Sequence, residues 1–193
     1  MTAPVVVGLD LSLSSTGVAI LGDGEHRILT LGSKPAGDRL RDRRRRLRDR
    51  RRRLSSLTDD IWDATETLGH PALVVVEGPS YGSRTGSQHD RSGLWWLVVD
   101  MLSDVDTAPE VVEVPPACRT RYATGKGNAD KDAVLAAAVR RYPWADVTGN
   151  DTADALILAA MGRRALGHPV DDPLPKTHLA AMAGVHWPEA ASR

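Results

Sequence analysis

Apolar residues near the start of the chain fall into short continuous runs separated by turn residues. The first two runs, 5–11 and 16–21, flank the sequence SLSS at 12–15, and a third run covers 27–32. Short apolar runs bounded by Ser, Gly and Asp are typical of buried strands. We therefore predict three strands joined by short turns, which form an antiparallel meander.

A seven-residue repeat follows these runs. Apolar positions recur at this spacing from Leu40 to Leu68, and further apolar residues fill the same stripe from Leu54 onward. This pattern predicts an amphipathic helix. We expect one long helix over 38–68, whose C-terminal half packs on the core and whose arginine-rich half projects.

Strands and helices alternate through the rest of the chain. The pattern predicts strands at 72–77 and 111–114 and helices at 94–102, 130–142 and 150–164. The order βββ-α-β-α-β-α-α favours an α/β fold with a mixed five-stranded sheet and helices on both faces. Residues 168–193 contain four prolines and little regular pattern, so we divide the chain into one domain at 1–167 and a Pro-containing tail at 168–193.

The composition narrows the class of protein. The 193 residues suffice for one domain with a hydrophobic core. A single cysteine, Cys118, excludes an intrachain disulfide and a cysteine-based zinc site. The N-terminal residues lack the basic segment of a signal peptide, and no apolar run is long enough to cross a membrane. We expect a cytoplasmic protein.

Positive charge is concentrated in one segment. Residues 39–53 hold 11 Arg and two Asp, including the tandem repeat LRDRRRR at 40–46 and 47–53. The rest of the chain holds 14 basic and 23 acidic residues. Such a segment is either a solvated helix or a contact surface for a polyanion, and we favour contacts with nucleic-acid phosphates.

Four acids have positions that suggest chemistry. Asp10 lies within an apolar strand and Glu77 ends another, while Asp151 and Asp154 open an Ala-rich helix at a spacing that puts both on one face. Each acid alone has an ordinary explanation as a solvated strand end or a helix cap. Buried carboxylates tolerate their charge when a cation binds them, and Mg²⁺ prefers such oxygen ligands.

Four sequence motifs carry a family resemblance. GLDLSLSSTGVAI, VVVEGPS, GKGNADKDAV and NDTADALILAA, in this order over about residues 5–166, resemble the RuvC-type Holliday-junction resolvases of the RNase H-like superfamily. The resemblance implies an RNase H-like nuclease domain with antiparallel strands one to three and parallel strands four and five. It also implies a homodimeric DNA endonuclease that resolves four-way junctions. Each active site would hold two Mg²⁺ ions, and Mn²⁺ would substitute for Mg²⁺.

The resemblance also assigns roles to residues. Asp10, Glu77, Asp151 and Asp154 match the metal ligands, and Lys131 matches a lysine that meets the scissile phosphate. The resemblance suggests further DNA contacts at a second basic position and at a loop aromatic. A loop lysine and the arginine segment, which is a departure from the family pattern, are expected to add others. These residues are Arg119, Lys126, Tyr81, Arg43, Arg44, Arg45, Arg46, Arg50, Arg51, Arg52 and Arg53. The predicted helix at 94–102, with Trp95 and Trp96, is the expected dimer interface or an ordinary core helix.

Other functions stay open at this stage. The same carboxylates would serve an RNase H-like nuclease that cleaves other branched DNA or RNA–DNA hybrids. A non-catalytic nucleic-acid-binding module, with the arginine segment as its main surface, is a further alternative. The sugar kinases of the actin-like fold share a similar first hairpin, but they need two such domains and this chain is too short.

Overall fold

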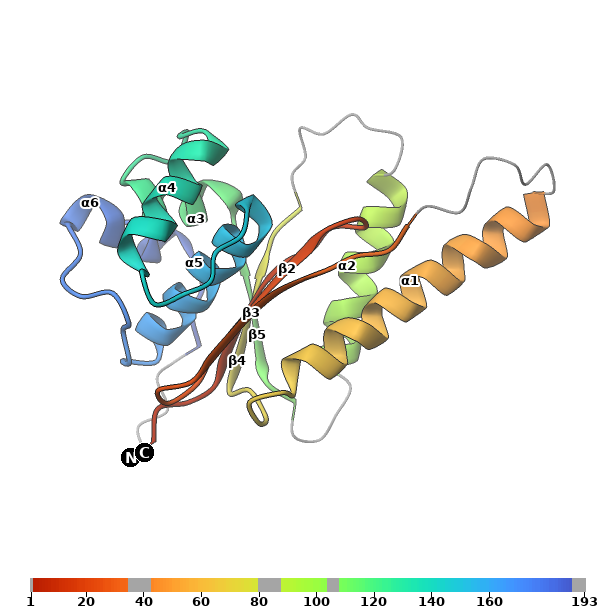
Figure 1. The fold of residues 1–193 in the computed structure, drawn as a ribbon, viewed down its shortest axis with the longest axis horizontal. Coiled ribbons are helices and arrows are strands. Elements are labelled where there is room, and N and C mark those ends of the chain that lie inside the picture. The colour runs from red at the N-terminus through yellow and green to blue at the C-terminus, as the bar shows by residue number, and fades with distance from the viewer. Residues whose placement is uncertain (1, 35–42, 80–87, 104–107, 189–193) are drawn as a thin grey trace.

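A five-stranded mixed sheet forms the centre of the molecule (Figure 1). The computed structural model describes residues 2–34, 43–79, 88–103 and 108–188, with the side chains of residues 43–45 outside that description. The strands are β1 (Val6–Asp10), β2 (Thr16–Leu21), β3 (His26–Leu31), β4 (Leu73–Glu77) and β5 (Glu110–Val114). Their order is β3-β2-β1-β4-β5, and β1 runs antiparallel to β2 and parallel to β4. The predicted fold class is confirmed.

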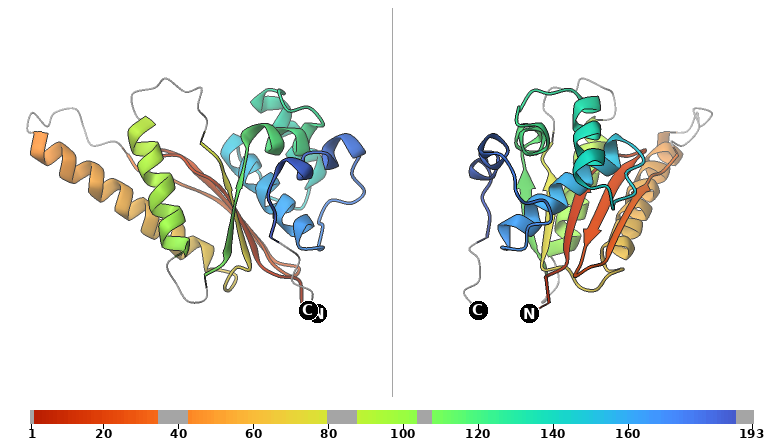
Figure 2. Two further views of the ribbon diagram at one scale, coloured as in Figure 1. Left: turned by 180° about the vertical axis from the view of Figure 1, so that it is seen from behind. Right: turned by 60° about the vertical axis from the view of Figure 1, so that its left-hand side comes forward.

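Helices cover both faces of the sheet (Figure 2). One face packs against α1 (Arg43–Thr65) and α2 (Gln88–Ser103), and the other packs against α3 (Pro116–Thr124), α4 (Lys131–Arg141) and α5 (Asn150–Ala165). Successive strand residues face opposite layers, so Val6 joins the core under α5 and Val7 joins the core under α1 and α2. Because both faces of β1 and β4 are buried, these strands read as continuous apolar runs.

Two glycines let α5 lie unusually close to the sheet. A Cβ at Gly8 would lie 2.1 Å from the carbonyl oxygen of Ala155, and a Cβ at Gly17 would lie 1.9 Å from that of Asp151. These positions accept no side chain, because nothing can shift except the α5 backbone. This close packing brings the N-terminal turn of α5 to the end of β1.

The arginine-rich helix is continuous and partly projects from the body (Figure 1). It ends at Thr65, earlier than the predicted end at 68, because a turn begins there with the amide of Thr67 bonding to the carbonyl of Ala64. The predicted residues 38–42 lie outside the described part. Leu57 and Ile61 are buried, whereas Leu47 is 66% exposed. The C-terminal half therefore packs on the core and the N-terminal half does not.

The helix α3 was absent from the predicted order. Pro116 occupies its first turn and Gly125 caps its C-terminus with a φ of 80°. A proline near the start and a glycine at the end of a helix are a recognised signal that the sequence contains. The helix matters because it carries Arg119.

The C-terminal segment is folded against the domain. It contains α6 (Lys176–Leu179) and the 3₁₀ turn η1 (Met182–Gly184), and Ala181 and Val185 are buried. Asp171 is 8% exposed and accepts hydrogen bonds from Tyr122 Oη (3.0 Å) and Tyr142 Oη (2.6 Å). The described part of the predicted tail thus shares a core with α3, α4 and α5, while the boundary at 167 stays a prediction.

Within the described ranges, none of the helices combines the length and apolar character that crossing a bilayer requires.

Candidate active site

Three carboxylates converge at one edge of the sheet. One oxygen from each of Asp10, Glu77 and Asp154 lies within 4.8 Å of the other two. Asp10 and Glu77 end the neighbouring parallel strands β1 and β4, whose register pairs Leu9 with Val76. Parallel neighbours end at the same edge, and α5 adds Asp154 from above this edge. Strands and helix thus hold all three acids on rigid backbone.

Burial and the charges of neighbouring acids act strongly on Asp10 and Asp154. Burial, followed by the charges of Glu77 and Asp154, raises the pKa of Asp10 to about 8. Burial and the charge of Glu77 raise the pKa of Asp154 to about 6, against the opposing charges of Arg119 and Lys131. A cluster that resists full ionisation gains most from a nearby positive charge.

Arg119 supplies one positive charge inside the cluster. Its guanidinium donates to Glu77 from Nε (3.2 Å to Oε2) and from Nη2 (3.1 Å to Oε1). Its Nη1 lies 2.6 Å from Oδ1 of Asp154, and the residue is 6% exposed. We predicted Arg119 as a DNA contact; the structure places it between two of the carboxylates.

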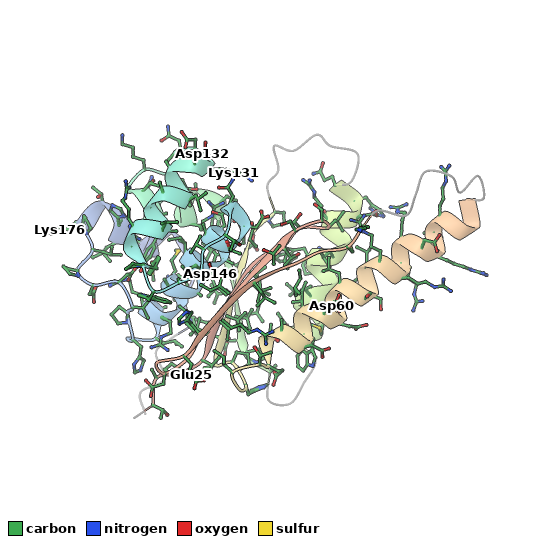
Figure 3. The ribbon with its side chains drawn as sticks, in the orientation of Figure 1. Glu25, Asp60, Lys131, Asp132, Asp146 and Lys176 are labelled. Atoms are coloured by element: carbon green, nitrogen blue, oxygen red, sulfur yellow. The ribbon has the colours of Figure 1, made fainter. Side chains whose placement is uncertain are left out.

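Lys131 lies at the rim of the same site. It is the first residue of α4, exposed, and lines a cavity of about 450 Å³ together with Asp10, Glu77, Asp154 and Arg119. Figure 3 labels it at the upper end of the molecule, beside Asp132. Because Lys131 is exposed and lines the cavity, its ammonium group is available to an entering anion.

Asp151 lines the cavity but is not part of the close cluster. Its Oδ2 accepts a hydrogen bond from Ser15 Oγ in the turn between β1 and β2. The spacing of Asp151 and Asp154 correctly put both on one side of α5. It could not indicate that a serine of the turn at 12–15 would bind the first acid, while the second joins Asp10 and Glu77.

The first half of α2 forms a wall of the cavity that the sequence did not reveal. The indole N–H of Trp95 donates to the backbone carbonyl of Glu77 at 3.1 Å, and Gln88, Arg91 and Ser92 also line the cavity. Trp96, in contrast, is 66% exposed. The two tryptophans therefore have different surroundings, because adjacent residues on a helix point in directions about 100° apart. The assignment of this helix to a dimer interface or to the core stays a prediction.

Two other predicted residues lie away from the close cluster or outside the described chain. Lys126 is exposed in the loop before α4 and lines a second, open groove of about 970 Å³ together with Arg140 and Arg141. The start of α4 borders both cavities, since Asp130 lines the groove and Lys131 lines the active-site cavity. Tyr81 lies outside the described residues.

The arginines of α1 do not form one uniform surface. Arg53 donates from Nε to Ser33 Oγ (2.7 Å) and from Nη2 to the carbonyls of Leu13 (2.9 Å) and Ser33 (2.8 Å). Arg50 forms a bidentate pair with Asp90 of α2. Arg46, Arg51 and Arg52 are exposed. Part of the predicted DNA surface thus attaches α1 to the body.

The donor set fits a divalent cation of the Mg²⁺ type. All ligand atoms in the cluster are carboxylate oxygens, and their separation allows one ion to contact all three acids. Neither sulfur nor imidazole belongs to the cluster, and those ligands would favour zinc.

The architecture matches solved structures of known activity. RuvC of Thermus thermophilus aligns with a TM-score of 0.60 and 17% identity, over 80% of this chain and 90% of that one. The T. thermophilus RuvC complex with a Holliday-junction substrate gives 0.58 and 16%, over 81% and 90%. The yeast mitochondrial resolvase Ydc2 gives 0.51 and 11%, over 81% and 76%.

Comparison of sequences finds no relative, although comparison of structures does. No protein-family model and no curated protein matches the chain. At identities of 11–17% the likeness concerns the fold. The chain has the RNase H-like fold of the RuvC-type Holliday-junction resolvases, as its sequence motifs predicted.

Proposed function

We propose that this protein is a Mg²⁺-dependent, structure-selective DNA endonuclease that resolves four-way junctions. The observation that carries the proposal is the convergence of Asp10, Glu77 and Asp154 at the open edge of a RuvC-like sheet. Three acids within 4.8 Å of each other, one buried and two half-buried, contribute little to folding, because their repulsion and desolvation oppose it. Such an arrangement is typical of metal-dependent phosphodiester hydrolysis.

Asp10, Glu77 and Asp154 would hold the ions, and Asp151 would contribute to a second position after leaving Ser15. Two bound Mg²⁺ or Mn²⁺ ions supply an activated water and stabilisation of the leaving oxygen. Trp95 would help to hold Glu77 in place, because its indole N–H donates to the backbone carbonyl of that residue.

Lys131 is the residue that would hold the scissile phosphate. It lines the same cavity as the strand carboxylates, and its charge already acts on Asp154. A phosphate in the cavity would lie between this ammonium group and the carboxylate cluster. The positive charge would stabilise the extra negative charge that develops during hydrolysis.

The DNA surface would extend from the site in two directions. Lys126 continues the basic rim beyond Lys131, and the exposed Arg51 and Arg52 lie on the projecting helix. Arg43, Arg44, Arg45, Arg46 and Tyr81 stay proposed contacts. Arg50 and Arg53 have intramolecular partners, so we expect them to contribute less to DNA affinity.

We also propose a homodimer, because cutting both strands of a symmetric junction needs two active sites. A groove of about 340 Å³ between α1 and α2 is lined by Leu47, Leu54 and Leu97. Leu47 and Trp96 are each 66% exposed and Leu97 is 43% exposed. Exposed apolar side chains on these two neighbouring helices suit an interface between two copies. Sedimentation of Leu97→Asp beside the wild type tests this surface.

The same site would serve cleavage of other branched DNA or RNA–DNA hybrids, and a binding-only module would need none of the acids. A cytoplasmic location stays a prediction from the single cysteine.

Cleavage of synthetic substrates in Mg²⁺ tests the proposal. The substrates are a mobile four-way junction, a fork, an RNA–DNA hybrid and a linear duplex, with the product ends mapped. We expect paired, symmetric nicks in the junction and slower cleavage of the others. Preferential cutting of the hybrid would favour the RNase H-like alternative. Binding without metal-dependent cleavage of any substrate would favour the module.

A further inference from the structure

Arg119 holds the carboxylate oxygens that a cation would need. Two of its nitrogens bond both oxygens of Glu77, and a third contacts Oδ1 of Asp154 at 2.6 Å. A fork that satisfies one carboxylate through two parallel N–H groups is among the strongest ion-pair geometries. With 6% exposure, water competes little for these contacts.

The guanidinium cannot relieve a conflict with a metal ion by losing its proton. Arginine stays protonated throughout the range in which proteins are stable. A divalent ion bound by Glu77 and Asp154 would therefore lie beside a fixed positive charge, at a separation where the repulsion is large. The two cations compete for the same carboxylates.

We propose that Arg119 is an internal counter-ion that must leave Glu77 and Asp154 before the cluster can bind a divalent cation. The inference rests on the proposed function, since it assumes that the cluster is a metal site. It assigns Arg119 a positioning role that a DNA contact alone does not explain.

The displaced side chain has a place to go. Arg119 lines the cavity of about 450 Å³ that Lys131 also borders. A phosphate entering this cavity would pair with the displaced guanidinium and so stabilise the state that binds the cation. Cation and DNA would then each raise the affinity for the other by the same factor.

Isothermal titration of Ca²⁺ into the DNA-free protein tests the competition. The variants are Arg119→Gln, Arg119→Lys and a matched control, Arg121→Gln, which changes an exposed arginine on the same helix. We expect Arg119→Gln to bind Ca²⁺ at least about tenfold more tightly than the wild type, and Arg121→Gln to bind it equally. Arg119→Lys should gain about threefold, because a lysine cannot hold Glu77 through a bidentate fork.

The outcomes separate this inference from the proposed function. Equal or weaker Ca²⁺ binding by both Arg119 variants, with clear binding by the wild type, would overturn the inference and leave the metal site intact. No Ca²⁺ binding by any of the proteins would overturn the metal site and the inference together. Should Arg119→Gln fail to fold, the Arg119→Lys titration decides.

A second measurement tests the coupling. Fluorescence anisotropy gives junction affinity with and without Ca²⁺, and we expect a gain of about fivefold or more for the wild type. In Arg119→Gln the gain should fall toward one. An undiminished gain in that variant would contradict the coupling.

Discussion

Gly17 faces Asp151 so closely that a Cβ added to the glycine would lie 1.9 Å from the carbonyl oxygen of the aspartate. Gly17 is also the cross-strand partner of Asp10. One small residue thus allows the start of α5 to approach the end of β1, and the distance between the strand and helix carboxylates depends on it.

Replacing Gly17 with alanine should therefore damage stability and activity together. Overpacking of this kind costs about 1–3 kcal/mol, and the displaced α5 would carry Asp154 away from Asp10. Denaturant unfolding and a cleavage assay measure the two effects. Gly93→Ala in α2 is the matched control, since a Cβ at Gly93 would meet only the side chain of Leu54 on α1, at 3.6 Å. That change should raise the free energy of unfolding by about 0.5–1 kcal/mol, and a loss of stability would contradict the packing described here.

The raised pKa values of Asp10 and Asp154 predict how stability depends on pH. Both folded-state pKa values lie above the ordinary value of 3.8, so the folded protein binds more protons than the unfolded chain. Their contribution is complete below about pH 4 and is lost as the pH rises through 6 and 8. In EDTA, the free energy of unfolding should fall over this range by at most about 1.4 kcal/mol per pH unit for each group.

Asp10→Asn tests that assignment, because asparagine does not titrate. The variant should have a flatter pH profile than the wild type in EDTA, chiefly between pH 4 and 8. An unchanged slope would mean that Asp10 is not the main titrating group.

The arginines of α1 should separate into two functional groups. The double variant Arg51→Gln, Arg52→Gln should weaken junction binding without loss of stability. The slope of log K against log salt concentration should become shallower by up to about two. Arg53→Gln should instead lower the free energy of unfolding by about 1–2 kcal/mol, because its bonds to Ser33 and Leu13 are lost. Salt titrations and denaturant unfolding measure both effects in both variants. The division into two groups would be refuted if the Arg51 and Arg52 changes lowered stability while Arg53→Gln chiefly weakened DNA binding.

Lys131 should contribute to catalysis and little to metal binding. Lys131→Gln removes the positive charge at the cavity rim and leaves the carboxylates intact, so we expect about a 10²-fold lower kcat with Ca²⁺ affinity within about twofold of wild type. Lys176→Gln is a suitable control, since Lys176 lies on α6, at the left of Figure 3 and away from Lys131. Equal effects of the two changes would argue against a role for Lys131 in the reaction.

The buried strands could be predicted from the sequence, because burial on both faces produces a continuous apolar run. The apolar runs that became β1, β2 and β4, and the acid at the end of each of β1 and β4, are visible in the sequence because both faces of these strands are buried. The short helix α3 was not predicted, since Pro116 follows the predicted strand at 111–114 so closely that it indicates the end of a strand as readily as the start of a helix.

Long-range contacts could not be predicted in the same way. Arg119 lies 42 positions from Glu77, and no periodicity indicates that the two bond. The binding of Asp151 by Ser15 spans 136 positions. Asp171 between Tyr122 and Tyr142 is likewise a tertiary network, formed by a segment whose sequence has little regular pattern.

Cleavage of a four-way junction by Asp10→Asn, measured beside junction binding, tests the central claim most directly. The substitution keeps the size of the side chain and removes a charged ligand from the cluster. We predict that the variant binds the junction with about wild-type affinity and that its Mg²⁺-dependent cleavage falls by about 10³-fold or more. Cleavage near the wild-type rate would show that the carboxylate cluster is not the catalytic centre.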